Sequence, residues 1–222
     1  MKDRVVITGI GTVTPIGIGR EKFWKNALAG VSGIGPIKSF DTSEFEIHHG
    51  GEVADFDPGL YEKQLPGLGR AAQLAVASTE EAVLDAGWST SELARINPGV
   101  VMGTTMGESQ TIEAIDALWL QGESLVPSGL IEKYPCYSIA HAVSARYGLS
   151  NISLTIPMAC AAGNYSIGYA YDLIRSGEAD VMIAGGADGL SRIAFTGFNR
   201  MFAVAPDCCR PFDKNRKGMI VS

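Results

Sequence analysis

The sequence lacks the features that mark several classes of protein. No run of apolar residues reaches the roughly 20 residues that a membrane-spanning helix requires. Lysine and arginine form no cluster and the formal net charge is −6, so neither nucleic acid nor an anionic membrane is an expected partner. Net charge leaves one case open, because an acidic protein is able to dock on a local basic patch.

Cysteine and histidine are scarce and poorly spaced for binding a metal. The chain has four cysteines and three histidines, at Cys136, Cys160, Cys208, Cys209, His48, His49 and His141. No two cysteines have CxxC spacing and no histidine has metal-ligand spacing with them, so we expect no metal site and no disulfide. Reduced thiols and a start that enters a strand pattern at once, leaving no room for a signal peptide, predict a cytoplasmic protein.

The remaining pattern is that of an α/β protein, and we expect one domain over residues 1–222. Short apolar runs predict buried strands at 5–10, 100–103, 152–156, 181–184 and 218–221. Helical patterns lie between them at 70–86, 111–120, 137–147 and 163–176. Strands that alternate with helices favour a parallel or mixed sheet in a layered α/β structure.

Two glycine-rich loops fail the tests for cofactor binding. The loop 9–17, GIGTVTPIG, has Thr14 where a dinucleotide loop needs its third glycine, and Pro15 interrupts the helix start that would hold a pyrophosphate. The pair Gly185 and Gly186 is not followed by the GK[ST] of a phosphate loop. We therefore expect no cofactor, and attribute these glycines to turns and to close passage of the backbone.

The stretch 152–163, ISLTIPMACAAG, carries the clearest chemical signal. It predicts a buried strand, a tight turn containing proline, and Cys160 in the first turn of a helix of small residues. Unpaired amides and the partial positive charge at a helix start favour a thiolate nucleophile there. Two other interpretations stay open: a small buried cysteine that only packs, and a cysteine hydrolase, although no histidine is obviously placed as its base.

The helix after Cys160 should lie deep in the protein. Its small residues permit close backbone approach, and we expect Ile167, Ala170, Tyr171 and Ile174 to form its inner stripe.

The chain resembles the β-ketoacyl-acyl carrier protein synthases, the condensing enzymes of fatty acid and polyketide synthesis, and within them the synthase II type. The resemblance is carried by blocks in the family's order: RVVITGIG at 4–11, TPIG at 14–17, GVSGI at 30–34, FD at 40–41, ACAAG at 159–163, GEADVMIAGGAD at 177–188, and RPFD at 210–213 with Gly218. The match spans nearly the whole chain and makes Cys160 the expected acyl-carrying nucleophile.

The resemblance implies a thiolase-like, layered α-β-α-β-α fold, of which this chain supplies mainly the N-terminal half, in a homodimer. It implies that Cys160 accepts an acyl group from an acyl carrier protein and that a malonyl-loaded carrier then loses carbon dioxide and attacks it. The Cys160 backbone N–H would form part of an oxyanion hole. The alternative is a non-catalytic partner subunit of a split or heteromeric ketosynthase, although such relatives typically lack the cysteine.

The departures from the family concern its second half. Two histidines and a lysine assist decarboxylation there, and none has a counterpart in these 222 residues, which are close to half the family's usual length. The run 218–221 looks like a strand cut off mid-run, an apolar edge that another chain or the missing half must cover. We expect the chain alone to be insoluble or to lack condensing activity.

Three residues are expected to set the substrate. Met106 resembles a position that lines the family's acyl pocket near the dimer interface, and Phe198 and Phe202 lie in a segment that approaches the acyl chain in relatives. The other interpretation of all three is ordinary core packing.

Overall fold

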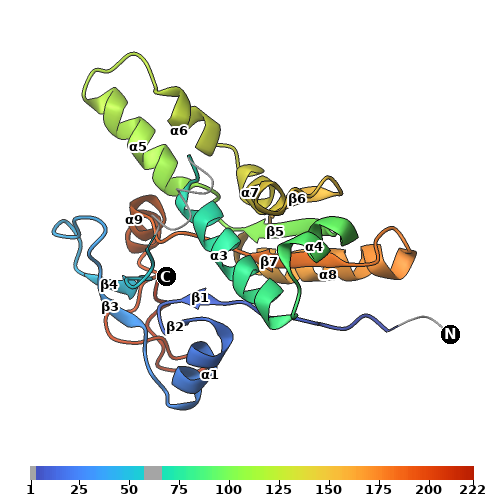
Figure 1. The fold of residues 1–222 in the computed structure, drawn as a ribbon. Coiled ribbons are helices and arrows are strands. Elements are labelled where there is room, and N and C mark those ends of the chain that lie inside the picture. Colours follow the sequence, from blue (N-terminus) through green and yellow to red (C-terminus); the bar gives the residue numbers. More distant parts are fainter. Residues whose placement is uncertain (1–3, 58–66) are drawn as a thin grey trace.

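A computed structural model gives the structure of residues 4–57 and 67–222 (Figure 1). In chain order its elements are β1 (Val13–Thr14), β2 (Gly17–Ile18), α1 (Arg20–Leu28), β3 (Ile34–Pro36), β4 (His49–Gly51), α3 (Arg70–Asp85), α4 (Thr90–Ile96), β5 (Gly99–Thr104), α5 (Ser109–Leu120), α6 (Ser128–Lys133), α7 (Ser138–Tyr147), β6 (Ser153–Pro157), the 3₁₀ helix η1 (Ala159–Ala161), α8 (Ala162–Ser176), β7 (Met182–Gly186) and α9 (Arg192–Arg200). Helices α5 and α6 extend away from the rest of the molecule.

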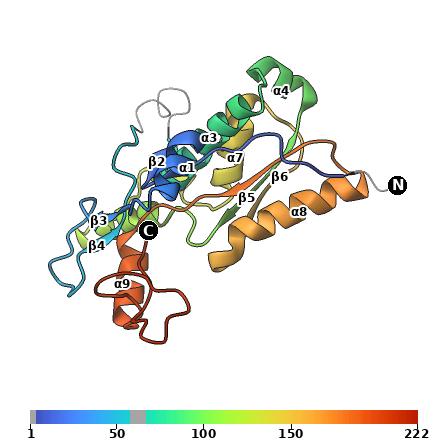
Figure 2. The same ribbon diagram turned by 90° about the horizontal axis from the view of Figure 1, so that it is seen from below.

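A three-stranded parallel sheet occupies the centre, in the order β6-β5-β7. Every residue of β5 is buried, because helices cover both faces of the sheet. Helices α3 and α7 pack on one face and α8 on the other (Figure 2). The chain therefore forms an α-β-α arrangement, and two antiparallel hairpins, β1-β2 and β3-β4, lie outside it.

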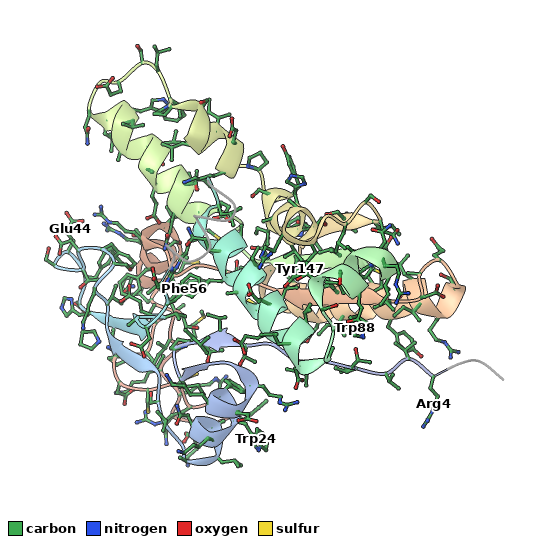
Figure 3. The ribbon with its side chains drawn as sticks, in the orientation of Figure 1. Arg4, Trp24, Glu44, Phe56, Trp88 and Tyr147 are labelled. Atoms are coloured by element: carbon green, nitrogen blue, oxygen red, sulfur yellow. The ribbon has the colours of Figure 1, made fainter. Side chains whose placement is uncertain are left out.

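The main core lies between the sheet and helices α3 and α7. Small residues of α3, such as Ala72 and Ala75, let α7 approach closely, and Ile139 and Val143 of α7 are fully buried against them. Tyr147, the last residue of α7, is also buried in this cluster. Figure 3 shows Tyr147 within the packed elements, whereas Trp24 lies at the periphery.

Most of the elements expected from the sequence are confirmed. The runs 100–103, 152–156 and 181–184 are β5, β6 and β7, and each predicted strand lies within two residues of the observed one. The predicted burial holds for β5 only, since β6 and β7 are the edge strands of the sheet and none of their residues is fully buried. The four predicted helices are α3, α5, α7 and α8.

Among the described residues, no helix is long and apolar enough to cross a bilayer, and no three potential ligands gather where they would hold a metal ion.

The prediction of a strand at 5–10 is wrong. This segment forms no sheet pairing with the described strands and runs along α3, where the Ile10 N–H donates to a carboxylate oxygen of Asp85 at 2.9 Å. Gly9 and Gly11 lie against the α3 backbone, and a Cβ on Gly11 would come within 1.7 Å of the Ser78 carbonyl oxygen. These glycines therefore serve close backbone packing, as the failed dinucleotide pattern indicated.

The strand expected at 218–221 is also wrong. Only a single bridge joins Val204 to Met219, and the carbonyl of Val221 accepts a hydrogen bond from the Gly51 N–H at 2.9 Å. The segment contacts residue Val204 and then strand β4, and neither contact extends into a run of paired strand residues. Val221 is nevertheless buried, in a cluster with Phe195.

The inner stripe expected for α8 is only partly correct. The side facing the sheet consists of Ala162, Ser166, Ala170 and Leu173. Ile167 and Tyr171 are about half exposed on the other side. Small side chains face inward at the start of the helix because it lies against the sheet backbone there, whereas Leu173 is accommodated near its end, beside Val101 and Ala179. Within this chain α8 is therefore covered on one face only.

Candidate active site

Three loops meet at the carboxyl edge of the parallel sheet. Strands β5, β6 and β7 end at Thr104, Pro157 and Gly186, and because they are parallel their following residues come together at one edge. Such an edge is where open α/β sheets place ligands. The residues that follow the strands here include Thr105, Cys160 and Asp188.

Residues Met158–Ala161, which we call the Cys160 turn, join β6 to α8. The 3₁₀ helix η1 leads directly into α8 at Ala162, which confirms the predicted order of strand, tight turn and helix. Ala159 has φ of 38°, a conformation that is uncommon for a residue with a Cβ and that the surrounding structure must hold. Cys160 is a free thiol and is exposed in this chain.

Glycines in the strands bring the start of α8 directly onto the sheet. A Cβ on Gly103 of β5 would lie 2.3 Å from the carbonyl carbon and oxygen of Ala162, and one on Gly186 of β7 would lie 3.1 Å from the Cα of Gly163. No described side chain caps the first turn of α8. The Ala162 N–H donates to the Ala159 carbonyl, and the other amides of the first turn, with the helix dipole, are available to a negatively charged oxygen beside Cys160.

Residues Thr104–Met106, the 104–106 loop, are fastened by Asp188. One carboxylate oxygen of Asp188 accepts hydrogen bonds from the Thr104 hydroxyl at 2.8 Å, the Thr105 N–H at 2.9 Å and the Met106 N–H at 3.1 Å. The Thr105 hydroxyl in turn donates to the carbonyl of Ala159 at 3.1 Å. A continuous set of contacts thus links Asp188 to the Cys160 turn.

Beyond this loop, Glu108 is a buried carboxylate that caps α3. Its oxygens accept hydrogen bonds from the Ala71 N–H at 3.2 Å and the Ala72 N–H at 2.8 Å, at a helix start that has no side-chain cap from its own Gly69. Burial raises the pKa of Glu108, and the amide hydrogen bonds and Lys133 oppose this shift.

The structure brings one of the three expected substrate residues to the edge that carries Cys160. Met106 lies in the 104–106 loop and its side chain is 40% exposed. Phe198 is on α9 and packs into the cluster around Phe195, while Phe202 follows α9 and is 92% exposed. Helix α9 packs against α5, and neither phenylalanine is on the 104–106 loop or the Cys160 turn.

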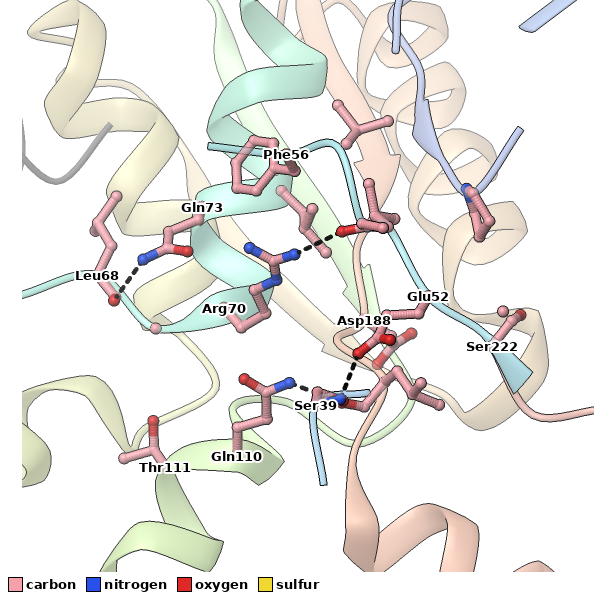
Figure 4. A pocket seen from close by; sticks show the side chains of 18 of the residues that line it. Ser39, Glu52, Phe56, Leu68, Arg70, Gln73, Gln110, Thr111, Asp188 and Ser222 are labelled. Atoms are coloured by element: carbon pink, nitrogen blue, oxygen red, sulfur yellow. Dashed lines mark hydrogen bonds between the residues drawn. The ribbon is translucent and has the colours of Figure 1, made fainter. Parts of the chain in front are cut away.

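A cavity of about 750 Å³ lies on the other side of Asp188 (Figure 4). Arg70, Gln73, Gln110 and Ser222 contribute to its wall, and Arg70 donates to the Val53 carbonyl at 3.2 Å. Cys160 is not among its lining residues. The cavity is therefore lined by Asp188 and not by the Cys160 thiol.

Sequence reasoning assigned no role to Asp188, Thr105 or Glu108. A usable signal was present for the first two, because polar residues directly after neighbouring parallel strands meet at one edge. Glu108 offered no such signal, since its partners are 36 and 37 residues away in the chain.

Comparison with known proteins agrees with this architecture. The family described as Beta-ketoacyl synthase, N-terminal domain, matches residues 2–222. The chain is 32% identical to 3-oxoacyl-(acyl-carrier-protein) synthase 2 of Synechocystis sp. over 99% of its length and 55% of that protein, and 34% identical to the protein of the same name from Coxiella burnetii over 99% and 56%. It spans about half the length of these relatives.

Solved structures show the same relation. The chain superimposes on the structure described as the ishigamide ketosynthase/chain length factor with a TM-score of 0.92, at 39% identity over 99% of this chain and 56% of that one. A second match, with a TM-score of 0.85 at 26% identity over 100% and 56%, is a ketosynthase bound to a hexaketide in complex with a type II polyketide synthase acyl-carrier protein.

The sheet, the helix packed against it and the cysteine at their junction define an α/β protein of the ketosynthase class. The chain belongs to the beta-ketoacyl synthase family and corresponds to its N-terminal domain. The family resemblance and the fold expected from the sequence are thereby confirmed, with this chain matching the N-terminal half of its relatives.

Proposed function

We propose that this protein is the N-terminal part of a condensing acyltransferase that joins a Cys160-bound acyl group to a malonyl unit carried by acyl carrier protein. The Cys160 sulfur attacks the carrier thioester, a new sulfur–carbon bond forms, and the carrier thiol leaves. Loss of carbon dioxide from malonyl-carrier then gives a carbanion that attacks the acyl carbon. The carbon–carbon bond forms as the Cys160 sulfur leaves.

The observation that carries this proposal is the exposed Cys160 on a sharp turn between β6 and α8, at the carboxyl edge of the sheet. Acyl transfer to Cys160 and the later condensation each pass through a tetrahedral intermediate with a negatively charged oxygen. Amides at the start of α8 stabilise such a charge. A cysteine hydrolase is less well supported. His49 begins β4 and His48 precedes it, in the hairpin outside the central sheet, where the His48 ring is hydrogen-bonded to the Thr42 hydroxyl. His141 belongs to α7, which packs on the opposite face of the sheet from α8.

The second half of the family fold is part of the proposal. Tyr165, Ile167, Tyr169 and Tyr171 expose about half of their side-chain surface on the outer side of α8. So large an apolar face needs a cover. We propose that residues 1–222 form one incomplete domain and that its C-terminal counterpart covers α8 and supplies the histidines and lysine of decarboxylation. Expressed alone, the chain should be insoluble or without condensing activity.

Partners and location follow from the same proposal. The relative in complex with its acyl-carrier protein supports an acyl carrier as the donor. We further propose a homodimer, or a complex with a chain carrying the C-terminal half, in the cytoplasm. Met106 would line the acyl site, and Phe198 and Phe202 would contribute once the missing half is present.

The test is the mass of the full-length protein after incubation with an acyl-carrier thioester. We expect acylation at Cys160, turnover to a β-ketoacyl product only when malonyl-carrier is added, and neither in Cys160→Ala. A non-catalytic partner subunit would not be labelled. A hydrolase would be labelled but would release free acid without malonate, and either result would refute the proposal.

A further inference from the structure

Asp188 holds the 104–106 loop with an unusually complete set of bonds. Three donors converge on its carboxylate, and the Thr105 N–H lies within 2.9 Å of one oxygen and 3.1 Å of the other. The Thr104 hydroxyl, while donating to Asp188, also accepts from the Gly107 N–H at 2.9 Å. A carboxylate has about four acceptor sites, so this one is largely occupied by the loop. It is arranged to hold the backbone and not to move a proton.

Thr105 carries this constraint to the nucleophile. Its amide is fixed by Asp188, and its hydroxyl donates to the carbonyl of Ala159, one residue before Cys160. Ala159 is the residue with φ of 38°. A non-glycine residue in that region persists only when its surroundings hold it there. The Ala159 carbonyl accepts two hydrogen bonds, one from the Ala162 backbone N–H, which closes the 3₁₀ turn, and one from the Thr105 hydroxyl, which ties the turn to the neighbouring strand.

We propose that Asp188 and Thr105 are positioning residues, which hold the Cys160 turn in its strained form and so place the sulfur for acyl transfer. This inference rests on the proposed function and adds to it. The position of the sulfur, which follows β6, then depends on the residues that follow the other two strands of the sheet, because Thr105 comes directly after β5 and Asp188 shortly after β7. The same bonds fix Met106, so the wall expected to contact the acyl chain is set by the same carboxylate.

A purely structural role makes a different prediction. If Asp188 and Thr105 only stabilise the fold, their variants lower the melting temperature, and the chemistry of the folded fraction is unchanged. If they position Cys160, the folded protein reacts more slowly, because small displacements of a nucleophile cost large factors in rate. Reaction rate per folded molecule, measured beside the melting temperature, separates the two.

The experiment compares Thr105→Val, Thr105→Ser and Asp188→Asn in the full-length protein. Valine keeps the shape of threonine but removes the hydroxyl, so acylation of Cys160 from an acyl-carrier thioester should slow by about fivefold to tenfold. Serine restores the hydroxyl and should restore most of the rate. The matched control is Thr79→Val, which removes a buried hydroxyl bonded at 2.8 Å to Ala75 inside α3 and should leave acylation unchanged.

A double variant tests whether the two residues act through one connection. Asp188→Asn replaces one acceptor oxygen by a donor facing the loop amides, and should slow acylation by a similar factor. Because both residues act on the same turn, the double variant should be little slower than the slower single variant. Multiplication of the two effects, or Thr105→Val acylating within twofold of wild type, would overturn the inference.

A second probe keeps this result separate from the proposed function. Alkylation of Cys160 by iodoacetamide reports the reactivity of the sulfur whether or not an acyl carrier is the natural donor. We expect Thr105→Val to slow alkylation by about threefold as the sulfur loses its place at the helix start. If wild type is not acylated but alkylation responds to Thr105, the proposed function fails and the positioning role stands. If acylation occurs and neither rate responds, only the positioning role fails.

Discussion

Replacing Gly103 by alanine should displace the start of α8 and with it Cys160. The added Cβ would lie 2.3 Å from two backbone atoms of Ala162 and 2.7 Å from the Gly163 nitrogen. Backbone atoms cannot rotate away as a flexible side chain can. The helix start would therefore have to retreat from β5 by about 1 Å to reach an ordinary contact of 3.4 Å.

Two magnitudes follow from this displacement. Forcing one extra carbon into a packed interior costs about 1–3 kcal/mol. In a domain of this size, each kcal/mol lowers the melting temperature by about 2–4 °C. A shift of about 1 Å in a reacting group costs about a hundredfold in rate, so acylation of Cys160 should fall by more than the loss of folded protein explains.

The assay is thermal unfolding together with acylation of the full-length protein by an acyl-carrier thioester. Gly129→Ala provides the control, because Gly129 lies in helix α6, away from α8, and an added Cβ there meets nothing within 4 Å. That variant should be more stable by up to about 1 kcal/mol, since alanine favours a helix over glycine. A Gly103→Ala protein that melts and acylates like wild type would show that α8 does not depend on this close contact.

Two further predictions concern the residues beside the site. Met106→Ala should let the enzyme accept longer acyl chains, and an unchanged product length by mass spectrometry would argue against a role in the pocket. Because burial raises the pKa of Glu108 above its usual 4.5, its stabilising contribution is complete below that pH and is lost as the pH rises through the pKa of the folded protein. The loss of stability in Glu108→Gln, measured by urea unfolding, should therefore shrink from about pH 4 to about pH 7; a loss that grows would contradict the assigned cause.

The sequence predicted the central sheet and its helices well, because these segments are strongly periodic. Strands β5, β6 and β7 are apolar runs between clear turn signals, and Gly87, with φ of 74°, follows the end of α3, where a helix commonly terminates in a glycine. Segments whose state depends on a neighbour were predicted poorly. Residues 5–10 have a strand composition, but in this chain they lie along a helix, and Val6 and Ile7 stay exposed.

The site was predictable at its centre and not around it. Cys160 follows from a local pattern of strand, proline turn and small residues. The contacts that hold it depend on residues distant in sequence, since Asp188 lies 83 positions from Thr105 and Thr105 lies 54 positions from Ala159. The direction of α8 was misjudged for a related reason. Hydrophobicity favoured Tyr171 as an inward residue, whereas the start of α8 lies against glycines of the sheet and its first inward residues, Ala162 and Ser166, are small.

The cap on α3 has a consequence for how the chain acquires its structure during synthesis. The first amides of this helix find their acceptor in Glu108, 36 and 37 residues further along. When α3 has left the ribosome and Glu108 has not, the amides of the first turn have no side-chain acceptor. That turn is then frayed and hydrated. The first turn of α3 becomes ordered only after β5 and Glu108 have emerged. It therefore forms later than the rest of the helix.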